Sequence, residues 1–466
     1  MAESRHALAF ADLEHEVDLA ELPITGAFPP WLSGTLLRVG AARWRVGHVQ
    51  LKHWFDGYAM LHRFAFSDGS VAYRNRMLDS AAWRSAKRGR QGFREFASDP
   101  WRPWFMRLWQ FLRPRFTDNA GVNLLAFAGR HIAVTETPAA VQFDPRTLAG
   151  IGPYRFAGRD AREKDNAHPL TDPIDGATWH LTTRLGKQCS YRLFRHAPGA
   201  EQGRVVAEIL VEQPMHIHSF AISERRVVIA EFPYGAPALA MAFDPRTLHR
   251  TYRWQPGRGT RWHVVDKASG VVTRIDGPAL YALHHVNAWD DGDATICDLA
   301  ACADADVIDQ FYLDRLRDPA TRYRLPVLQR HRIDARRGTV ERVALPETPF
   351  EFPRVAPSRQ GLRHGVAWGV AADGAGGFID RIVALAGDGS VRATWRVDGC
   401  VPAEPHPVPR PGATDEDDAV LLSLVLDTAA GRSFLLALDA RDCRELGRAH
   451  LPHHVPLGLH GEFFPG

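Results

Sequence analysis

The 466-residue sequence has no run of about 20 apolar residues, which excludes a transmembrane helix. Its N-terminal stretch soon turns acidic and has no long apolar segment, so we expect no signal peptide. There is no Gly-x-Ser-x-Gly elbow, no Walker loop and no His-Glu-x-x-His motif. The net charge of +3, from 57 Lys and Arg against 54 Asp and Glu, is too small to indicate nucleic-acid binding.

Cysteine is also scarce. The five cysteines are odd in number and widely spaced, and no Cys-x-x-Cys occurs. This pattern argues against a disulfide framework and a thiolate zinc site, and it favours a reducing cytosol. Histidine, by contrast, is abundant at 22 residues, so a metal site is best sought among the imidazoles.

Short strand-like segments dominate the chain, and long amphipathic helical patterns are scarce. The strands are rich in Val, Ile, Leu and aromatic residues and are bounded by Gly, Pro or Asp. Examples lie at 71–77, 131–136, 204–211, 226–232, 381–386 and 420–426. With 45% hydrophobic residues, the composition is that of a globular protein, and the strand pattern predicts an all-β fold.

A weak internal repeat accompanies these strands. The hexapeptide Phe-Asp-Pro-Arg-Thr-Leu occurs at 143–148 and again at 243–248. Looser versions lie at 265–270, 333–338, 426–431 and 438–442. Each predicts a strand end followed by an Asp turn into the next strand. The recurrence favours a propeller or another radial β array, although such turns also occur in other β proteins.

One segment, at about 84–116, departs from the β pattern. It holds Trp101, Trp104, Phe105 and Trp109, with Arg residues interleaved. These residues suit a helix lying in a membrane interface. A helix packed on the domain, with its Trp side chains in the core, would have the same sequence pattern. No linker divides the chain, so we expect residues 1–466 to form a single domain with this segment as an insertion.

Four histidines stand next to strand-like segments that are far apart in the sequence. They are His168, His218, His284 and His460. Each could point inward from a different part of a radial array, and imidazole suits Zn, Cu, Fe or Ni. Alternation cannot select among neighbours, because His216 would point the same way as His218. Ordinary surface or core histidines remain the alternative.

Three glutamates at strand ends are candidates to accept the second ring N–H of such imidazoles. They are Glu136, Glu351 and Glu404, each placed among apolar residues or prolines. Glutamates at exposed strand ends would give the same local pattern.

At these residues the sequence resembles the carotenoid cleavage oxygenase family. Matching segments run in order at 30–40, 53–64, 71–76, 117–119 and 133–138. They continue through the four histidine contexts, Glu-Phe-Pro-Arg at 351–354 and Leu-His-Gly at 459–461. The segments at 55–60 and 117–119 look more like the β-carotene oxygenase and retinoid isomerase branch than the stilbene-cleaving branch. One departure is Ser219, where the family commonly has Asp, and it predicts looser hydrogen bonding around His218.

The resemblance implies a seven-bladed β-propeller with a loop-and-helix cap over its top face. It implies one Fe(II) ion on the axis, bound by His168, His218, His284 and His460. Glu136, Glu351 and Glu404 would then hold the imidazoles. The family's apolar tunnel mouth makes Trp101, Trp104, Phe105 and Trp109 the expected membrane-facing residues. From motif position, Trp54, Phe55 and Tyr58 are candidates for the tunnel wall.

The implied function is cleavage of a conjugated C=C bond of a carotenoid or apocarotenoid by Fe(II) and O2, giving aldehyde or ketone products. Two alternatives keep the fold: cleavage of a stilbene or phenylpropanoid, and isomerisation of a retinoid. A third alternative is a non-catalytic propeller that binds apocarotenoids. We expect a cytoplasmic protein peripherally associated with a membrane, monomeric or weakly oligomeric, with a hydrophobic polyene and no nucleic acid as partner.

Overall fold

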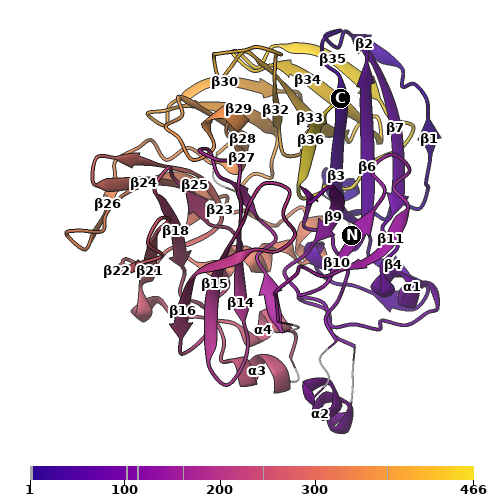
Figure 1. Ribbon diagram of the computed structural model, residues 1–466. Coiled ribbons are helices and arrows are strands. Elements are labelled where there is room, and N and C mark those ends of the chain that lie inside the picture. Colours follow the sequence, from indigo (N-terminus) through magenta and orange to yellow (C-terminus); the bar gives the residue numbers. More distant parts are fainter. Residues whose placement is uncertain (1–3, 101–102, 113–114, 161, 245, 375) are drawn as a thin grey trace.

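The computed structural model describes residues 4–100, 103–112, 115–160, 162–244, 246–374 and 376–466. In this part of the chain, seven antiparallel sheets of four to six strands surround a central axis, like the blades of a propeller (Figure 1). The expected seven-bladed β-propeller is therefore confirmed.

The first four blades follow chain order. Blade 1 contains β1 (Asp18–Leu19), β7 (Ser70–Met77), β6 (Tyr58–Ser67), β3 (Gly34–Arg43) and β36 (Gly461–Pro465). Blade 2 contains β11 (Gly150–Tyr154), β10 (Ala140–Phe143), β9 (Arg130–Val134) and β8 (Asn123–Phe127). Blade 3 contains β12 (Glu163–Asp165), β14 (Thr178–Arg184), β15 (Cys189–His196) and β16 (Arg204–Val211), with β13 (Leu170–Thr171) also paired to β14. Blade 4 contains β17 (Ala221–Ile222), β18 (Arg226–Glu231), β21 (Thr260–Asp266) and β22 (Val272–Gly277).

Three further blades complete the ring. Blade 5 contains β23 (Tyr281–Asp291), β24 (Ala294–Cys302), β25 (Val327–Asp334) and β26 (Thr339–Val343). Blade 6 contains β27 (Glu351–Arg354), β28 (Val366–Ala371), β29 (Arg381–Ala386) and β30 (Val391–Arg396). Blade 7 contains β2 (Ile24–Gly26), β35 (Glu445–His450), β34 (Arg432–Asp439), β33 (Ala419–Asp427) and β31 (Cys400–Pro402), with β32 (His406–Pro409) also on β33.

Short elements connect the blades. The α-helices are α1 (Ala81–Lys87), α2 (Trp104–Leu112), α3 (Ala238–Phe243), α4 (Leu248–Thr251) and α5 (Leu313–Arg317). The 3-10 helices are η1 (Ala7–Phe10), η2 (Trp54–Asp56), η3 (Pro256–Arg258), η4 (Ala305–Phe311) and η5 (Pro357–Arg359). Two small ribbons pair β4 (Arg45–Val46) with β5 (Val49–Gln50), and β19 (Tyr234–Gly235) with β20 (Arg253–Trp254). Within the described residues, no helix combines the length and apolar character needed to span a bilayer.

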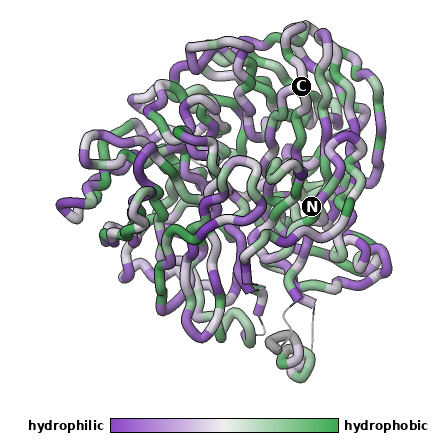
Figure 2. Tube along the Cα trace, viewed as in Figure 1, coloured by the Kyte–Doolittle hydropathy of each residue, from purple (hydrophilic) through white to green (hydrophobic). Residues whose placement is uncertain are grey.

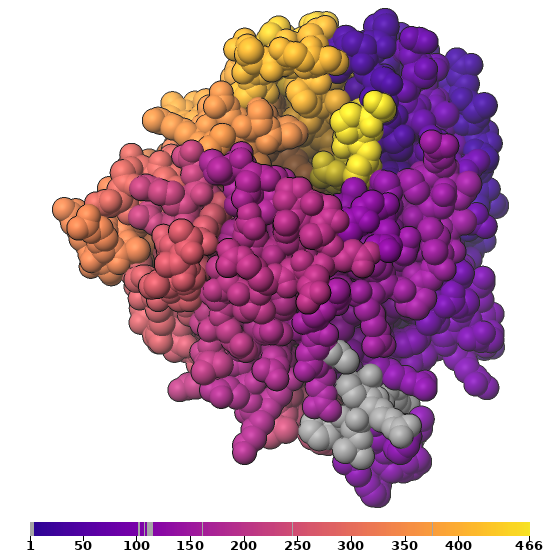
Figure 3. Space-filling view, viewed as in Figure 1, coloured from indigo at the N-terminus to yellow at the C-terminus, as the bar shows by residue number. Residues whose placement is uncertain are grey.

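The two ends of the chain interlock the ring. The C-terminal strand β36 pairs with β3 in blade 1, and the N-terminal strand β2 pairs with β35 in blade 7. Figure 3 shows the C-terminal residues, in yellow, lying against the indigo N-terminal region. Closing a ring in this way leaves few strand edges exposed, which limits pairing with other chains.

The apolar core lies largely between blades. Trp368, on β28, is fully buried, and its indole N–H donates to the carbonyl of Ala440 at 3.0 Å, which ties blade 6 to blade 7. Each buried large apolar side chain stabilises the fold by roughly 1.5–3 kcal/mol. Along the tube in Figure 2, green and purple segments mix within the strands, as expected for strands with an inner and an outer face.

The predicted Asp turns mostly form the hairpins that the repeat suggested. The turn at 265–270 joins β21 to β22, with Asp266 accepting a hydrogen bond from Ser269 N at 2.8 Å and Gly270 at φ +73°. The turns at 333–338, 426–431 and 438–442 likewise join β25 to β26, β33 to β34 and β34 to β35. In each turn the Asp supplies a local acceptor, and in the three turns that end in Gly, at 270, 338 and 431, the Gly adopts a left-handed conformation.

The second copy of the hexapeptide is an exception, and the prediction of a strand there was wrong. Residues 143–148 join β10 to β11, whereas residues 243–248 lie between helices α3 and α4. Both Asp144 and Asp244 accept a hydrogen bond from the backbone N–H two residues on, at 2.9 Å. The Asp therefore makes the same local hydrogen bond in both copies, and the preceding Ala-Leu-Ala-Met-Ala segment, made of strong helix formers, changes the element before it.

Candidate metal centre

The four predicted histidines come from the inner ends of four blades. His168 lies between β12 and β13, His218 precedes β17, His284 lies in β23, and His460 immediately precedes β36. The register of β23 against β24 shifts between Ala282 and His285, so His284 sits at an irregularity of its strand. The structure thus brings together side chains that are up to 292 residues apart in the sequence, from His168 to His460.

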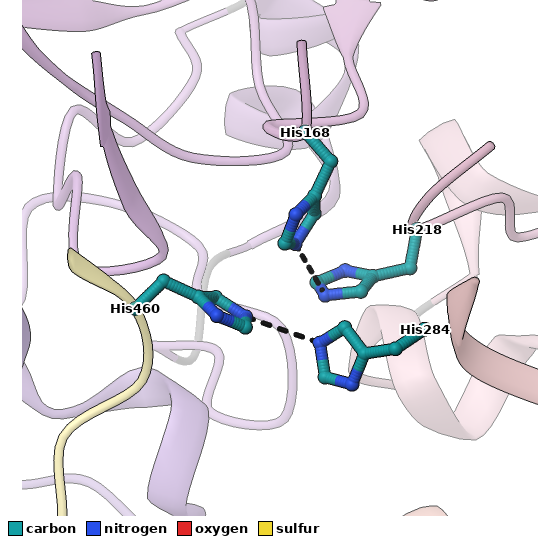
Figure 4. Close-up of side chains that lie close together, drawn as sticks. All are labelled: His168, His218, His284 and His460. Carbon is teal, nitrogen blue, oxygen red and sulfur yellow. Dashed lines mark hydrogen bonds between the residues drawn. The ribbon is translucent and has the colours of Figure 1, made fainter. Parts of the chain in front are cut away.

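The imidazoles converge on one point (Figure 4). One ring nitrogen of each of the four residues lies within 4.8 Å of the corresponding nitrogens of the others. The Nε2 atoms of His168 and His218 are 2.9 Å apart, and those of His284 and His460 are 3.1 Å apart. For a metal–nitrogen distance of about 2.1 Å, neighbouring ligands at right angles would be about 3.0 Å apart and opposite ones about 4.2 Å. These spacings therefore fit four nitrogens around a single ion.

Three of the rings are oriented by the three predicted glutamates. The Nδ1 of His218 lies 2.5 Å from Glu136 Oε1, that of His284 lies 2.6 Å from Glu351 Oε2, and that of His460 lies 2.9 Å from Glu404 Oε1. A carboxylate accepts, so each ring carries its proton on Nδ1 and leaves Nε2 as a lone pair. Among the described residues, no carboxylate bonds to His168.

This tautomer makes the four-nitrogen cluster chemically incomplete. Two Nε2 lone pairs at 3.1 Å, as between His284 and His460, cannot hydrogen-bond to each other when both protons are on Nδ1. A cation placed between them satisfies all the lone pairs at once. The neutral donors and the three surrounding carboxylates therefore fit a divalent metal such as Fe(II), for which imidazole is a suitable ligand.

Burial keeps the imidazoles of His168, His218 and His460 neutral. It holds the pKa of His168 well below its ordinary value, with the other three rings contributing, and it lowers the pKa of His218. Burial also lowers the pKa of His460 to about 3. A metal ligand must be deprotonated, so the polypeptide alone already prepares these three rings for binding near neutral pH.

Glu136 serves two histidines, and only one of them was predicted as a ligand. Its second oxygen lies 3.0 Å from Nε2 of His216, whose Nδ1 contacts the hydroxyl of Tyr281 at 3.0 Å. Burial alone would raise the pKa of Glu136, but its interactions with His216 and His218 hold that pKa well below the usual range. The alternating positions of His216 and His218 predict that both side chains lie on the same side of the chain. They do not indicate which of the two rings belongs to the four-histidine cluster.

Glu404 lies in a buried network that the sequence did not reveal. Its Oε1 accepts from Nε of Arg354 at 2.9 Å, and its Oε2 lies 2.9 Å from Nε2 of His406. Arg38, which is almost fully buried, donates to the Glu404 carbonyl at 3.2 Å. Burial would raise the pKa of Glu404, yet Arg354, His460 and His406 hold it well below its ordinary value. The only sequence signal was Arg354 in the Glu-Phe-Pro-Arg motif.

Ser219 does not loosen the site, contrary to the sequence-based expectation. Its Oγ donates to the carbonyl of Leu283 at 2.6 Å and accepts from the N–H of His285 at 2.9 Å. Ser219 thereby ties the segment of His218 to the strand that carries His284. His285 points away from the cluster, toward Ser219, as strand alternation predicts for adjacent residues.

Two residues beside the centre have unusual backbone conformations. Ala167, which precedes His168, has φ +60°, and Phe352, which follows Glu351, has φ +49°. A left-handed conformation is uncommon for a bulky residue such as Phe. It lets the Phe352 N–H donate to Glu351 and sets the ring 5.6 Å from His284 and 5.5 Å from His460, centroid to centroid. The strain is therefore located where the imidazoles are positioned.

An apolar cavity of about 740 Å³ opens beside the cluster. His218, His284 and His460 form part of its wall, together with many aromatic and aliphatic side chains. Of the three aromatic residues suggested by motif position, Trp54 and Phe55 border the cavity, whereas Tyr58 packs against Trp83 with ring centroids 5.7 Å apart. The cavity reaches helix α3, where Ala238, Leu239 and Met241 line it.

Exposed apolar side chains gather on helices α2 and α3, which contact each other at one end of the molecule (Figure 1). We call them the α2–α3 patch: Trp104, Phe105, Met106, Leu108, Trp109, Leu239 and Phe243. Trp104 is 76% exposed and Trp109 57% exposed, so the alternative of a helix with its Trp side chains in the core was wrong for these two. Trp101, the fourth predicted member, lies outside the described residues.

Comparisons with known proteins agree with this architecture. A family model described as "Retinal pigment epithelial membrane protein" matches residues 10–465. The Arabidopsis thaliana protein named Carotenoid cleavage dioxygenase 8, chloroplastic, is 30% identical over 99% of this chain and 86% of its own length. The Galleria mellonella protein named Carotenoid isomerooxygenase is 29% identical over 97% of this chain and 95% of its own.

A solved structure shows the same fold. The crystal structure of cobalt-substituted Synechocystis ACO matches with a TM-score of 0.89 at 24% identity, covering 99% of this chain and 98% of that one. With the family model spanning almost the whole sequence, the chain belongs to the carotenoid cleavage oxygenase family. The family resemblance inferred from the motifs is confirmed.

Proposed function

We propose that this protein is an Fe(II)-dependent oxygenase that cleaves a conjugated C=C bond of a carotenoid or apocarotenoid with O2, giving aldehyde or ketone products. The observation that carries the proposal is a cluster of four imidazoles, three of which form part of the wall of a largely apolar cavity of about 740 Å³. The names of the curated relatives, carotenoid cleavage dioxygenases and a carotenoid isomerooxygenase, support the substrate class and the reaction.

His168, His218, His284 and His460 would hold the ion, and Glu136, Glu351 and Glu404 would orient three of the rings and offset its charge. When bound, one ferrous ion supplies the activation of O2, a chemistry that amino-acid side chains do not provide. Four histidine ligands would leave room at the ion for O2 and for approach of the substrate.

The cavity wall would bind the substrate and shield it from water. Apolar side chains such as Phe311, Phe352 and Ile379 exclude water and hold a polyene by contact alone. Phe55 and Trp54 present aromatic rings to the same cavity, where they could stabilise positive charge that develops on the conjugated chain. No side-chain acid or base is required for this role.

We propose that the α2–α3 patch docks on a membrane surface and delivers the hydrophobic substrate. Leu239 belongs both to the patch and to the cavity wall, so an apolar path runs from the exposed surface toward the imidazoles. Aromatic side chains of this kind suit the interface of a bilayer. The chain would thus form one propeller domain, with residues of about 84–116 as a membrane-facing insertion. All five cysteines are unpaired, which suits a reducing cytoplasm.

The test is aerobic incubation of iron-loaded protein with a panel of carotenoids and apocarotenoids, with products identified by mass. We expect two carbonyl fragments from at least one polyene, and no product from the metal-free protein. Cleavage of hydroxystilbenes alone would establish the stilbene alternative, and a geometric isomer without oxygen incorporation would establish the isomerase. Tight ligand binding without stoichiometric iron and without turnover would point to a non-catalytic binder.

A further inference from the structure

One cationic side chain enters the cavity from the segment that carries His168. Lys164 lies at the centre of β12, four residues before His168, which is at most about 13 Å along an extended chain. Its neighbours Glu163 and Asp165 are buried on the opposite face of the strand, where they pair with Arg192 and Arg159. Because side chains alternate along a strand, Lys164 points to the other side, and there it lines the cavity.

Lys164 interacts with a tyrosine and a carboxylate. Burial alone would lower the pKa of its ammonium group, but the hydrogen-bonding hydroxyl of Tyr252 and the charge of Glu136 outweigh this and raise the pKa. Tyr252 is buried, with its ring 5.3 Å from Tyr234 and 6.0 Å from His216, centroid to centroid. A rigid phenol thus holds the flexible lysine on the Glu136 side of the metal centre.

The other described cations of the cavity wall are engaged or exposed. Arg94 pairs with Asp99, and Arg324 pairs with Asp304. Arg115, Arg162 and Lys187 are exposed at the rim. Among the described cations of this wall, Lys164 is therefore the one that combines partial burial, a hydroxyl partner and proximity to Glu136.

A protonated amine in an apolar cavity must be matched by an acceptor when substrate displaces water, because an unpaired charge there is costly. A pure hydrocarbon offers no such acceptor. We propose that Lys164 recognises an oxygen-bearing group, a hydroxyl or a carbonyl, at one end of the conjugated substrate, with Tyr252 as the residue that positions the ammonium. The inference rests on the proposed function, since it names which members of the substrate class this cavity prefers.

The contact is a hydrogen bond and not a covalent one. A lysine attacks an aldehyde only as the neutral amine, and the neighbours of Lys164 favour its protonated form. The ammonium therefore donates to the oxygen and leaves the carbonyl carbon intact. Preference for an oxygenated end group then selects the substrate and its direction in the cavity, which sets the double bond presented to the imidazoles.

Equilibrium binding tests the proposal without any need for turnover. Iron-loaded protein is titrated without O2 with two apocarotenals of equal length, one with a hydroxyl on its terminal ring and one with a hydrocarbon ring, and with the corresponding hydrocarbon that lacks the aldehyde. We expect the wild type to bind at least one oxygenated compound about 10- to 100-fold more tightly than its deoxy partner, the range of one charge-assisted hydrogen bond.

Lys164→Met should abolish that preference by weakening the oxygenated ligand alone, and Lys164→Arg should restore part of it. Tyr252→Phe should reduce the preference by a smaller factor with unchanged iron content. Lys187→Met removes an equal charge from the rim and should leave the ratio of affinities unchanged. An equal loss for both ligands in Lys164→Met, or no preference in the wild type, including no binding, overturns the inference.

Turnover in air separates this result from the proposed function. A preference in binding without any carbonyl product would sustain the lysine site and reject the oxygenase. Cleavage of a polyene at equal rates and affinities with or without the oxygen group would sustain the oxygenase and reject the lysine site.

Discussion

Oε2 of Glu351 lies 2.6 Å from Nδ1 of His284, and this contact decides which nitrogen of the imidazole faces the other three rings. Glu351 also accepts the backbone N–H of Phe352, so its position is fixed by its own strand end. Glu404 plays the same part for His460 but additionally pairs with Arg354. Glu351 therefore mainly orients an imidazole, whereas Glu404 both orients an imidazole and stabilises the fold through Arg354.

Glu351→Gln should lower iron affinity by about 10- to 100-fold, the usual effect of losing a carboxylate behind a metal-bound imidazole. The amide is isosteric, so the fold should remain intact. Metal content after dialysis against graded chelator concentrations, measured with the thermal midpoint, gives both quantities. Glu208→Gln, at an exposed site on β16, is the control and should change neither. Wild-type affinity in Glu351→Gln would show that the orienting bond is dispensable.

Glu404→Gln should lower iron affinity by a similar factor and also destabilise the fold. The substitution removes the buried partner of Arg354 and leaves it only the half-exposed Glu462, so the loss should be at most the roughly 3–5 kcal/mol that breaking a buried pair typically costs. The free energy of unfolding of the metal-free protein, from denaturant titration, checks this. Equal stability of the Glu351→Gln and Glu404→Gln proteins would contradict the distinct role given to Arg354.

His218→Ala and His460→Ala should each abolish stoichiometric iron retention and turnover. Each removes one of four nitrogens that lie within 4.8 Å of one another, and no water can reproduce the orientation of a buried ring. Metal analysis and product formation are measured on protein shown to be folded by circular dichroism. His331→Gln, a buried histidine packed 5.0 Å from Trp262 between ring centroids, is the matched control and should keep its iron. Full activity in either alanine variant would remove that residue from the ligand set.

The residues of the candidate site were largely predictable because each stands in a short sequence motif that can be recognised without the structure. The four histidines and three glutamates were each identified by their immediate neighbours. Strand alternation correctly placed His285 away from His284. It could not choose between His216 and His218, since both lie on one side and the choice depends on Glu136 and Tyr281, which are distant in the chain.

Other features could not be predicted, because they arise from packing of remote segments. Lys164 and Tyr252 are far apart in the sequence, and only the ring of blades brings them together. The hexapeptide at 243–248 is a second example of a segment whose structure its local sequence does not determine. Its Asp makes the same local hydrogen bond as the Asp of residues 143–148, but the flanking elements are set by helix propensity and by contacts of α3 and α4. Local chemistry set the hydrogen bond of the Asp, and tertiary context decided which elements lie on either side of it.

Replacing Trp104 and Trp109 together with Ser should weaken binding to liposomes by at least about tenfold. The two side chains are 76% and 57% exposed, and inserting that apolar area into a bilayer interface stabilises the bound state by roughly 25 cal/mol per Å². Co-sedimentation with vesicles containing anionic lipid measures the partition. Val391→Ser, an exposed apolar residue on β30 outside the α2–α3 patch, is the control. Unchanged partition of the double variant would leave the patch without a membrane role.

Buried titratable groups give the folding stability of this protein two opposing pH dependences. Burial lowers the pKa values of His53 and His62 to about 3, so the folded state keeps them neutral while the unfolded chain takes up protons below about pH 6.5. Burial raises the pKa of Asp56 to about 7 and that of Glu95 to about 8. These carboxyl groups therefore lower the free energy of unfolding as the pH rises above the pKa values that they have in the unfolded chain. The total stability curve therefore does not isolate either effect.

The difference between the wild type and His62→Gln does isolate the histidine. His62 is buried and contacts the Tyr73 hydroxyl at 3.0 Å. Below about pH 6.5 the wild type should lose up to about 1.4 kcal/mol of stability per pH unit through this group, and His62→Gln should lack that loss. Denaturant titrations of both proteins at pH 7.5, 6.5 and 5.5 give the difference. Since glutamine cannot titrate, the two free energies of unfolding should converge as the pH falls. A gap that stays constant from pH 7.5 to 5.5 would mean that His62 is protonated in the folded protein or does not titrate on unfolding.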